Sequence, residues 1–161
     1  MITKDQLAED YAQNLRLIEM QTAGLSHADS LIQTLYNINC LNWVLGHIAV
    51  GRDSVLQEVG EEPLLSEAET NRYKTESDPI TEDGEHVIQL KRLLEILTTG
   101  QMRINSGLSR LNEDELLREV RVGERRVPLG VRLHGFYFHD TYHTGQTDLL
   151  RQIAGTNDKI I

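Results

Sequence analysis

The feature that most constrains this sequence is a run of apolar side chains, near its middle, that recur every three or four residues. The run contains, in order, Val87, Leu90, Leu94, Leu97, Gln101, Ile104, Leu108 and Leu111. This alternation indicates an α-helix packed along one seam against other helices. Gly100 and Gly107 lie within the run and lower its helix propensity, so we expect packing to hold this helix.

The rest of the chain divides into similar stretches. Three prolines, which helix interiors exclude, separate them: Pro63, Pro79 and Pro128. Thr3 can cap a first helix, and Gly24 can end it in a left-handed conformation. We expect long helices at about residues 3–22, 39–59, 87–111 and 128–155, with a short helical turn at 27–33.

Two connections between the predicted helices, at residues 61–78 and 115–128, have their own sequence character. Residues 61–78 are polar and contain Pro63, so we expect a long connection that crosses one end of the helices. Residues 115–128 fit a loose turn or a short hairpin. Four long helices without a convincing sheet predict an all-α fold, a four-helix bundle with its long connection between helices two and three. The length of 161 residues suits a single domain over residues 1–161.

The charge balance excludes one class of partner. The chain carries a formal net charge of −9, whereas a protein that binds DNA or RNA needs a basic stripe. Basic residues do gather between 118 and 126, but acidic residues interleave them. We therefore expect a solvated loop there rather than a nucleic-acid site, at Arg118, Arg121, Arg125 and Arg126.

The sequence also predicts a cellular setting. No apolar run approaches the ~20 residues that a membrane-spanning helix needs. The first residues lead directly into a charged amphipathic stretch without the apolar region of a signal peptide. Cys40 is the one cysteine, so no intramolecular disulfide can form, which suits a reducing compartment. We expect a cytoplasmic protein with no membrane partner.

Two histidines stand in the predicted inner seam of the last helix. That seam contains Leu129, Leu133, Phe136, His139, His143, Gln146, Leu150 and Ile153. His139 and His143 are four residues apart, the spacing at which two imidazoles on one helix share a metal ion. Buried histidines can also be satisfied by hydrogen bonds alone, so the pair by itself leaves both interpretations open.

A third histidine favours the metal. On the helix at 39–59, His47 follows Cys40 and Trp43 in steps of three and four, so it faces inward. Gly46 lets a neighbouring helix or a ligand approach closely. Helical bundles build metal sites from side chains on facing helices. The sequence therefore predicts a metal site with three protein ligands, His47, His139 and His143.

The remaining candidates do not join this site. We expect His27 in a loop, His86 in the first turn of the third helix and His134 on another face of the last helix, all solvated. Cys40 lies about two turns, roughly 10 Å, from His47, too far for the same metal. Asp140 and Asp148 lie off the seam, so neither presents itself as a general base.

Together, these residues resemble a known family. Trp43, Gly46 and His47 look like the Trp-x-x-Gly-His helix of the DinB/YfiT-like superfamily. The order His139, Asp140, His143, Gly145, Gln146 is similar to its closing helix, His-Glu-x-x-His-x-Gly-Gln. The resemblance covers the whole chain in order and length. Asp140 departs from it, because many members carry Glu at that position.

The resemblance implies an up-down-down-up bundle, one divalent metal on the three histidines and often a homodimer. Imidazole ligands suit zinc, nickel, iron and copper, and we expect zinc or nickel. Leu93 and Ile96, next to the seam of the third helix, suggest a surplus apolar face for a second copy. We expect Trp43, Phe136 and Tyr142 to wall the site, with Gln146 and Asp140 beside the ligands.

Three hypotheses for function follow. Three protein ligands leave positions for water or substrate, as in catalytic sites. The first is thiol-dependent transfer to a small electrophilic substrate, resembling the bacillithiol, mycothiol and glutathione transferases of the family, with the metal holding a low-molecular-weight thiol as its thiolate. The second is a metal-dependent hydrolase. The third is a non-catalytic metal-binding or stress-response protein whose metal steadies the bundle.

Overall fold

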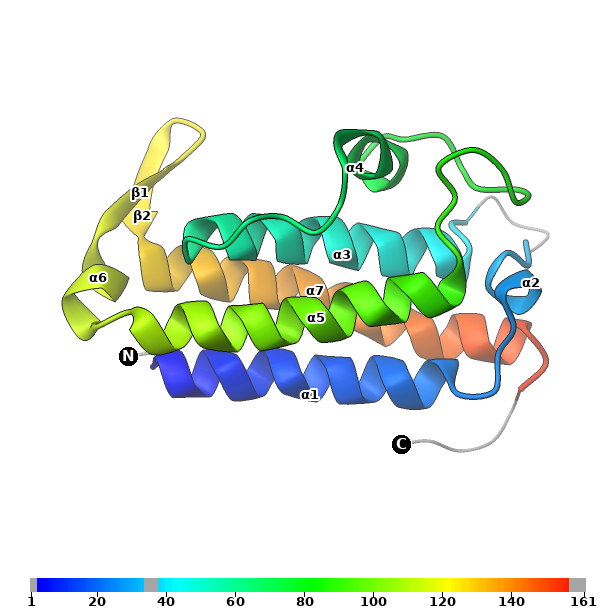
Figure 1. Ribbon diagram of the computed structural model, residues 1–161, viewed down its shortest axis with the longest axis horizontal. Helices are drawn as coiled ribbons and strands as arrows, with labels where there is room; N and C mark the ends of the chain where they lie inside the picture. Colours follow the sequence, from blue (N-terminus) through cyan, green and yellow to red (C-terminus); the bar gives the residue numbers. More distant parts are fainter. Residues whose placement is uncertain (1–2, 34–37, 157–161) are drawn as a thin grey trace.

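The structure is a computed structural model that describes residues 3–33 and 38–156. These residues are mostly helical, with one small sheet (Figure 1). The elements are, in order, α1 Lys4–Thr22, α2 His27–Ser30, α3 Leu41–Glu58, α4 Glu67–Tyr73, α5 Leu90–Arg110, α6 Glu113–Leu117, β1 Glu119–Val122, β2 Arg125–Pro128 and α7 Leu129–Ile153. No helix within the described residues has the length and apolar character to cross a membrane.

The four long helices lie side by side (Figure 1). Helices α1 and α7 run in one direction, and α3 and α5 run in the other. Each of α1 and α3 packs against both α5 and α7. Because α3 and α7 are neighbours along their length, side chains that face each other across this pair can meet.

The ends of the first helix agree with the sequence prediction. The Thr3 hydroxyl accepts a hydrogen bond from the backbone N–H of Gln6, and Gly24 has φ of +79°. Helix α5 instead begins at Leu90, later than predicted. His86 therefore lies before the helix rather than in its first turn, with φ of 62°, which a regular helix excludes.

The connection at 61–78 was predicted wrongly in two respects. It contains α4, and it runs back alongside α3 rather than across one end of the helices (Figure 1). A capping box starts α4: Ser66 and Glu69 bond each other's backbone N–H. Tyr73 at its end lies directly on Gly46 of α3, where any Cβ would overlap the tyrosine ring. Gly46 thus permits the close approach that the sequence predicted, and the element that approaches it is α4.

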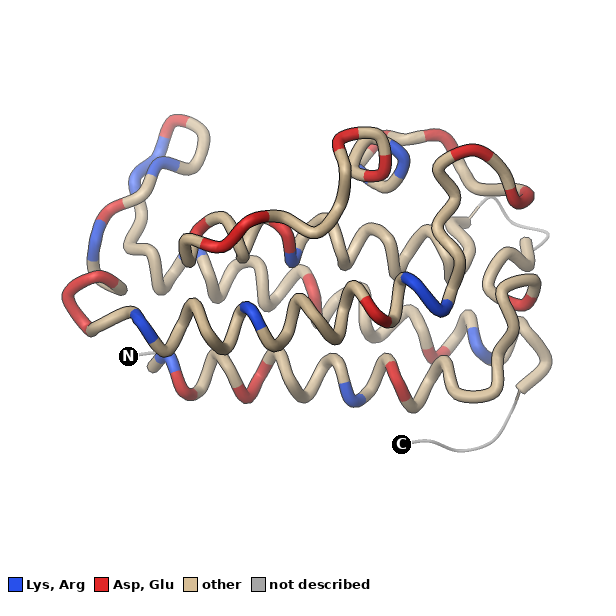
Figure 2. The backbone as a smooth tube through the Cα atoms, viewed as in Figure 1, with Lys and Arg blue, Asp and Glu red and all other residues tan. Residues whose placement is uncertain are grey.

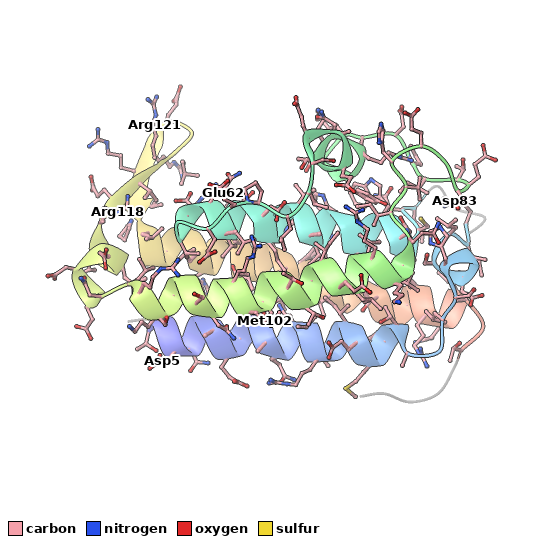
Figure 3. All side chains as sticks on the ribbon, viewed as in Figure 1. Asp5, Glu62, Asp83, Met102, Arg118 and Arg121 are labelled. Carbon is pink, nitrogen blue, oxygen red and sulfur yellow. The ribbon has the colours of Figure 1, made fainter. Side chains whose placement is uncertain are left out.

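Residues 119–128 form an antiparallel hairpin, one of the two forms expected. Glu119 pairs with Pro128, and Val122 pairs with Arg125. Basic and acidic positions are interleaved along this segment (Figure 2). The four arginines predicted to be solvated are exposed, and Figure 3 labels the first two: Arg118, Arg121, Arg125 and Arg126. The Arg126 guanidinium lies 3.8 Å from the Glu119 carboxylate, so part of this charge is compensated locally.

The interior contains two apolar clusters. One is centred on Leu45, Ile48 and Leu97, and the other on Leu56, Ile104 and Leu133. Leu93 is fully buried in the first cluster, and Ile96 packs against it. The surplus apolar face predicted on the third helix is therefore covered within the chain.

A layer of buried polar side chains separates the two clusters. Arg52 of α3 donates from Nε to the Asp140 carboxylate of α7 at 2.7 Å. The same guanidinium donates to the Tyr11 carbonyl of α1 at 3.2 Å and to the Gln101 side-chain oxygen of α5 at 3.3 Å. Asn14 of α1 completes the layer by donating to Asp140 at 2.9 Å. One guanidinium thus joins all four long helices.

We predict that Asp140→Ala lowers the free energy of unfolding by about 3–5 kcal/mol, because it leaves the Arg52 charge buried without its carboxylate. The matched control is Glu95→Ala, which breaks an exposed pair with Lys91 and should cost less than about 1 kcal/mol. Urea denaturation of the two variants and the wild type measures both values. Equal losses in the two variants would contradict the assigned importance of the buried pair.

Candidate metal centre

The structure brings the three predicted histidines together. His47 comes from α3, and His139 and His143 come from successive turns of α7. The ring centroids are 4.9 Å apart for His47 and His139, 4.7 Å for His47 and His143, and 4.5 Å for the pair on α7. One ring nitrogen from each lies within 4.8 Å of the others. No other group of this kind occurs among the described His, Cys, Asp and Glu residues.

Hydrogen bonds fix the orientation of two of these rings. His47 Nδ1 lies 2.8 Å from the Tyr73 carbonyl oxygen, which can only accept, so Nδ1 carries the proton. His143 Nδ1 lies 2.7 Å from Oε1 of Gln146 and donates to it in the same way. In the neutral form of each ring, Nε2 is then the nitrogen with a free lone pair, the arrangement that orients metal-binding histidines in proteins. Gln146 therefore lies against His143, and its role beside a bound metal stays a prediction.

The surroundings keep two of the rings neutral. Burial lowers the pKa of His47, against the opposing effect of its hydrogen bond to Tyr73. Burial, followed by the neighbouring His143 and His47 rings, lowers the pKa of His139 to about 4. At neutral pH both imidazoles are uncharged and can offer a lone pair, as metal ligation requires.

The donor set fits one divalent transition metal ion. Imidazole–metal bonds are ~2.0–2.1 Å long, so nitrogens around one ion lie roughly 3–4 Å apart. The Nε2 atoms of His47 and His139 are 3.0 Å apart, within that range. These three nitrogens could therefore hold a metal ion, and their chemistry admits several transition metals.

A cavity of about 560 Å³ adjoins the histidines. The Trp43 ring stacks on His47 with centroids 4.6 Å apart, and Tyr142 meets His143 edge-on at 5.1 Å. Among the described residues, no Asp, Glu, Lys or Arg side chain lines it. Its walls are Ile38, Asn39, Trp43, Val44, His47, Thr75, His139, Tyr142, His143, Gln146, Leu149 and Leu150.

Two predicted neighbours of the site lie elsewhere. Phe136 packs against the second apolar cluster, with the Arg132 guanidinium 4.0 Å from its ring centre. Asp140 is buried against Arg52 and does not line the cavity. Phe136 shares the face of His139 but lies about one turn before it, whereas the α7 residues of the cavity begin at His139. Asp140 differs for another reason: it, rather than His139, faces the interior, and one residue turns a helix by about 100°. His139 and His143 are consequently half-buried beside the core, whereas His47 is buried.

The remaining candidates are mostly as expected. His134 and His86 are exposed, and the Cys40 thiol is buried, which raises its pKa and keeps it protonated. The prediction for His27 was wrong, because this residue begins α2 and is half-buried. Its Nδ1 accepts from the backbone N–H of Leu90 at 3.2 Å, so it caps the start of α5.

Sequence reasoning missed the contribution of the end of α4 and of the segment that follows it. Tyr73 orients His47 through its backbone oxygen, and Thr75 lines the cavity. Ser77 accepts a hydrogen bond from Trp43 Nε1 at 2.8 Å. The available signal was the Ser-x-x-Glu pattern of Ser66 and Glu69, which starts a short helix in an otherwise polar stretch.

Comparisons with known proteins add information on the fold. No protein-family model matches this chain, and no curated protein matches it. Among solved structures, the chain is similar to a conserved protein from Enterococcus faecalis, with 20% sequence identity and a TM-score of 0.75. The likeness covers 97% of this chain and 99% of that chain. At this identity it shows a shared fold alone.

We predict that protein purified without chelator carries about one divalent transition ion per chain, and that His143→Ala loses most of it, because two imidazoles hold an ion far more weakly than three. Elemental analysis of folded protein measures this. The matched control is His134→Ala, an exposed histidine of the same helix, which should keep the wild-type content. Equal metal content in His143→Ala and the control would refute the site.

Proposed function

We propose that this chain is a metal-binding four-helix bundle of the DinB/YfiT-like superfamily, with one zinc or nickel ion held by His47, His139 and His143. Three features support the proposal: the up-down-down-up directions of the long helices, the convergence of the three ring nitrogens, and the resemblance of Trp43 and Gln146 to the family motifs. In the structure, both of these residues contact a ligand histidine.

The function that this site supports best is transfer of a low-molecular-weight thiol to a small electrophilic substrate. The observation that carries it is the position of three convergent imidazoles at the edge of a cavity that no described Asp, Glu, Lys or Arg side chain lines. When bound, the metal would supply the positive charge that holds a thiol as its thiolate. No carboxylate among the cavity residues competes for that charge.

The protein's own residues would bind and orient the reactants. Trp43, Val44 and Leu150 supply apolar walls that exclude water, which strengthens electrostatic attraction inside the cavity. Asn39 and Thr75 offer polar groups to a substrate. Gln146 holds the His143 ring in place, and the Tyr73 carbonyl holds His47.

Hydrolysis is less well supported. A hydrolytic site needs a general base near the attacking water, and the acidic residue adjacent to the ligands, Asp140, is buried in its ion pair with Arg52. A purely structural metal site does not require an adjoining cavity, whereas this site has one of about 560 Å³. Thiol transfer therefore remains our proposal, ahead of the hydrolase and of the non-catalytic metal-binding protein.

We predict that one low-molecular-weight thiol changes the spectrum of the cobalt-substituted protein. The expected result is a sulfur-to-metal charge-transfer band in the near ultraviolet, together with a raised melting temperature, because a ligand that binds the folded state stabilises it. The panel consists of glutathione, bacillithiol, mycothiol and coenzyme A. The oxygen analogue of the responding thiol, with hydroxyl in place of sulfhydryl, is the control.

One responder in the panel supports thiol transfer. If no thiol alters the cobalt spectrum or the melting temperature, the proposal should give way to a hydrolytic or non-catalytic role. Cobalt content is measured in the same samples, so loss of the metal and lack of thiol binding can be told apart.

A further inference from the structure

Helix α4 is attached to the bundle through a single buried side chain. It lies alongside α3, outside the four long helices, and α3 is its main packing partner (Figure 1). From residue 66 to residue 79, Tyr73 is the one buried side chain. Leu65 and Ile80, which are also buried, hold the two ends of this stretch. We refer to residues 66–79 as the α4 segment.

Tyr73 contacts three parts of the chain at once. Its ring lies on Gly46 of α3, and its hydroxyl donates to the Asn42 side-chain oxygen at 2.8 Å. The same hydroxyl accepts from the backbone N–H of Ile88 at 2.7 Å. Its carbonyl oxygen accepts from Nδ1 of His47 at 2.8 Å. The side chain thus fixes the position of α4, and the backbone of the same residue meets a candidate metal ligand.

The α4 segment also forms part of the cavity wall. Thr75 lines the cavity, and Ser77 accepts a hydrogen bond at 2.8 Å from Nε1 of Trp43, another wall residue. Between them, Glu76 has φ of 67°, a left-handed conformation that residues with a Cβ adopt rarely and at an energetic cost. Such a conformation persists where surrounding contacts enforce it, so this stretch depends on its attachment to α3.

The hydrogen bond between His47 and Tyr73 is of a kind that responds to metal. Metal-binding histidines commonly donate their other N–H to a backbone carbonyl, which raises the basicity of the ligand nitrogen. The effect is mutual. When Nε2 binds a cation, the ring loses electron density and its Nδ1–H becomes a stronger donor. The bond that gains strength is the one made by the single anchor of the α4 segment.

We propose that Tyr73 is a positioning residue of the metal centre and couples metal binding to the docking of the α4 segment on α3. A divalent ion on the histidines strengthens the hydrogen bond from His47 and holds the segment in place. Because such coupling is reciprocal, docking of the segment raises metal affinity by the same factor. The inference rests on the metal site of the proposed function and is independent of the thiol.

The coupling makes the shape of the cavity depend on the metal. Thr75 and Ser77 keep their positions while Tyr73 is docked, since no other side chain of the α4 segment is buried. Weaker docking frees Trp43 from Ser77 and opens this side of the cavity. The metal therefore contributes twice to substrate binding, through its open positions and through the wall that it stabilises.

Zinc affinity of folded variants tests the coupling. Tyr73→Phe removes the hydroxyl alone and leaves the Tyr73 carbonyl and all three histidines present. We expect it to weaken zinc binding on the order of tenfold, because the ring docks less firmly without its two hydroxyl partners. The matched control is Tyr11→Phe, which should keep the wild-type affinity. It removes another buried hydroxyl, which donates to the Leu133 carbonyl at 2.9 Å.

A second variant reaches the same anchor from the other side. Gly46→Ala places a Cβ where the Tyr73 ring lies, so it displaces the ring without removing any group of the site. The substitution raises the helix propensity of α3, so the helix itself is not weakened. We expect zinc affinity to fall as in Tyr73→Phe, with circular dichroism showing that each variant is folded.

Hydrogen exchange of the wild type supplies a measurement that needs no variant. We expect zinc to slow exchange of the backbone amides at residues 66–79 by about tenfold, the size of a typical coupling between two sites. The hairpin at residues 119–128 is the internal control, because it lies at the opposite end of the bundle from α4 and should not respond (Figure 1).

Two results would overturn the coupling: equal zinc affinities of Tyr73→Phe and Tyr11→Phe, or exchange at residues 66–79 that zinc does not slow. A wild type that binds neither zinc nor nickel would refute the metal site itself, and the coupling with it. If zinc produces both expected effects while no thiol alters the cobalt spectrum, thiol transfer fails and the coupling stands.

Discussion

The buried ion pair between Arg52 and Asp140 is the interaction on which the arrangement of the site depends. Arg52 lies five residues after His47 on α3, and Asp140 directly follows His139 on α7. A shift of α7 along α3 by one turn would separate two buried charges and leave each without a partner, at a cost of several kcal/mol. The pair therefore fixes the register in which His47 faces His139 and His143. We interpret its role as specificity of packing more than net stability.

The second constraint comes from the segment outside the long helices. Gly46 lets the Tyr73 ring lie on α3, and the Tyr73 carbonyl then orients the His47 ring. The Tyr73 hydroxyl accepts from the backbone N–H of Ile88 and donates to Asn42, so α4 is attached to both α3 and the approach to α5. The polar residues 61–78, which connect α3 to α5, therefore help to position the histidines of the site.

The sequence predicted the long helices and the three histidines because both follow from spacing along single helices. It did not predict which side of α7 faces the core. Asp140, Thr144 and Thr147 are polar, and the two partners of Asp140, Arg52 and Asn14, lie 88 and 126 residues away. The spacing of apolar residues along one helix contains no information about such long-range polar pairs. Asp140 was consequently misplaced, and Phe136 lies about one turn before the cavity residues of α7. The other predicted residues meet at the cavity: His47, His139, His143, Trp43, Tyr142 and Gln146.

The central claim is that these three imidazoles hold one metal ion beside a cavity. X-ray absorption spectroscopy at the edge of the bound metal tests it most directly, because it reports ligand type and bond length together. We expect three imidazole nitrogens at ~2.0–2.1 Å and at least one further light-atom ligand that an added thiol replaces. A metal environment without imidazole scattering, or one saturated by protein ligands and indifferent to thiols, would contradict it.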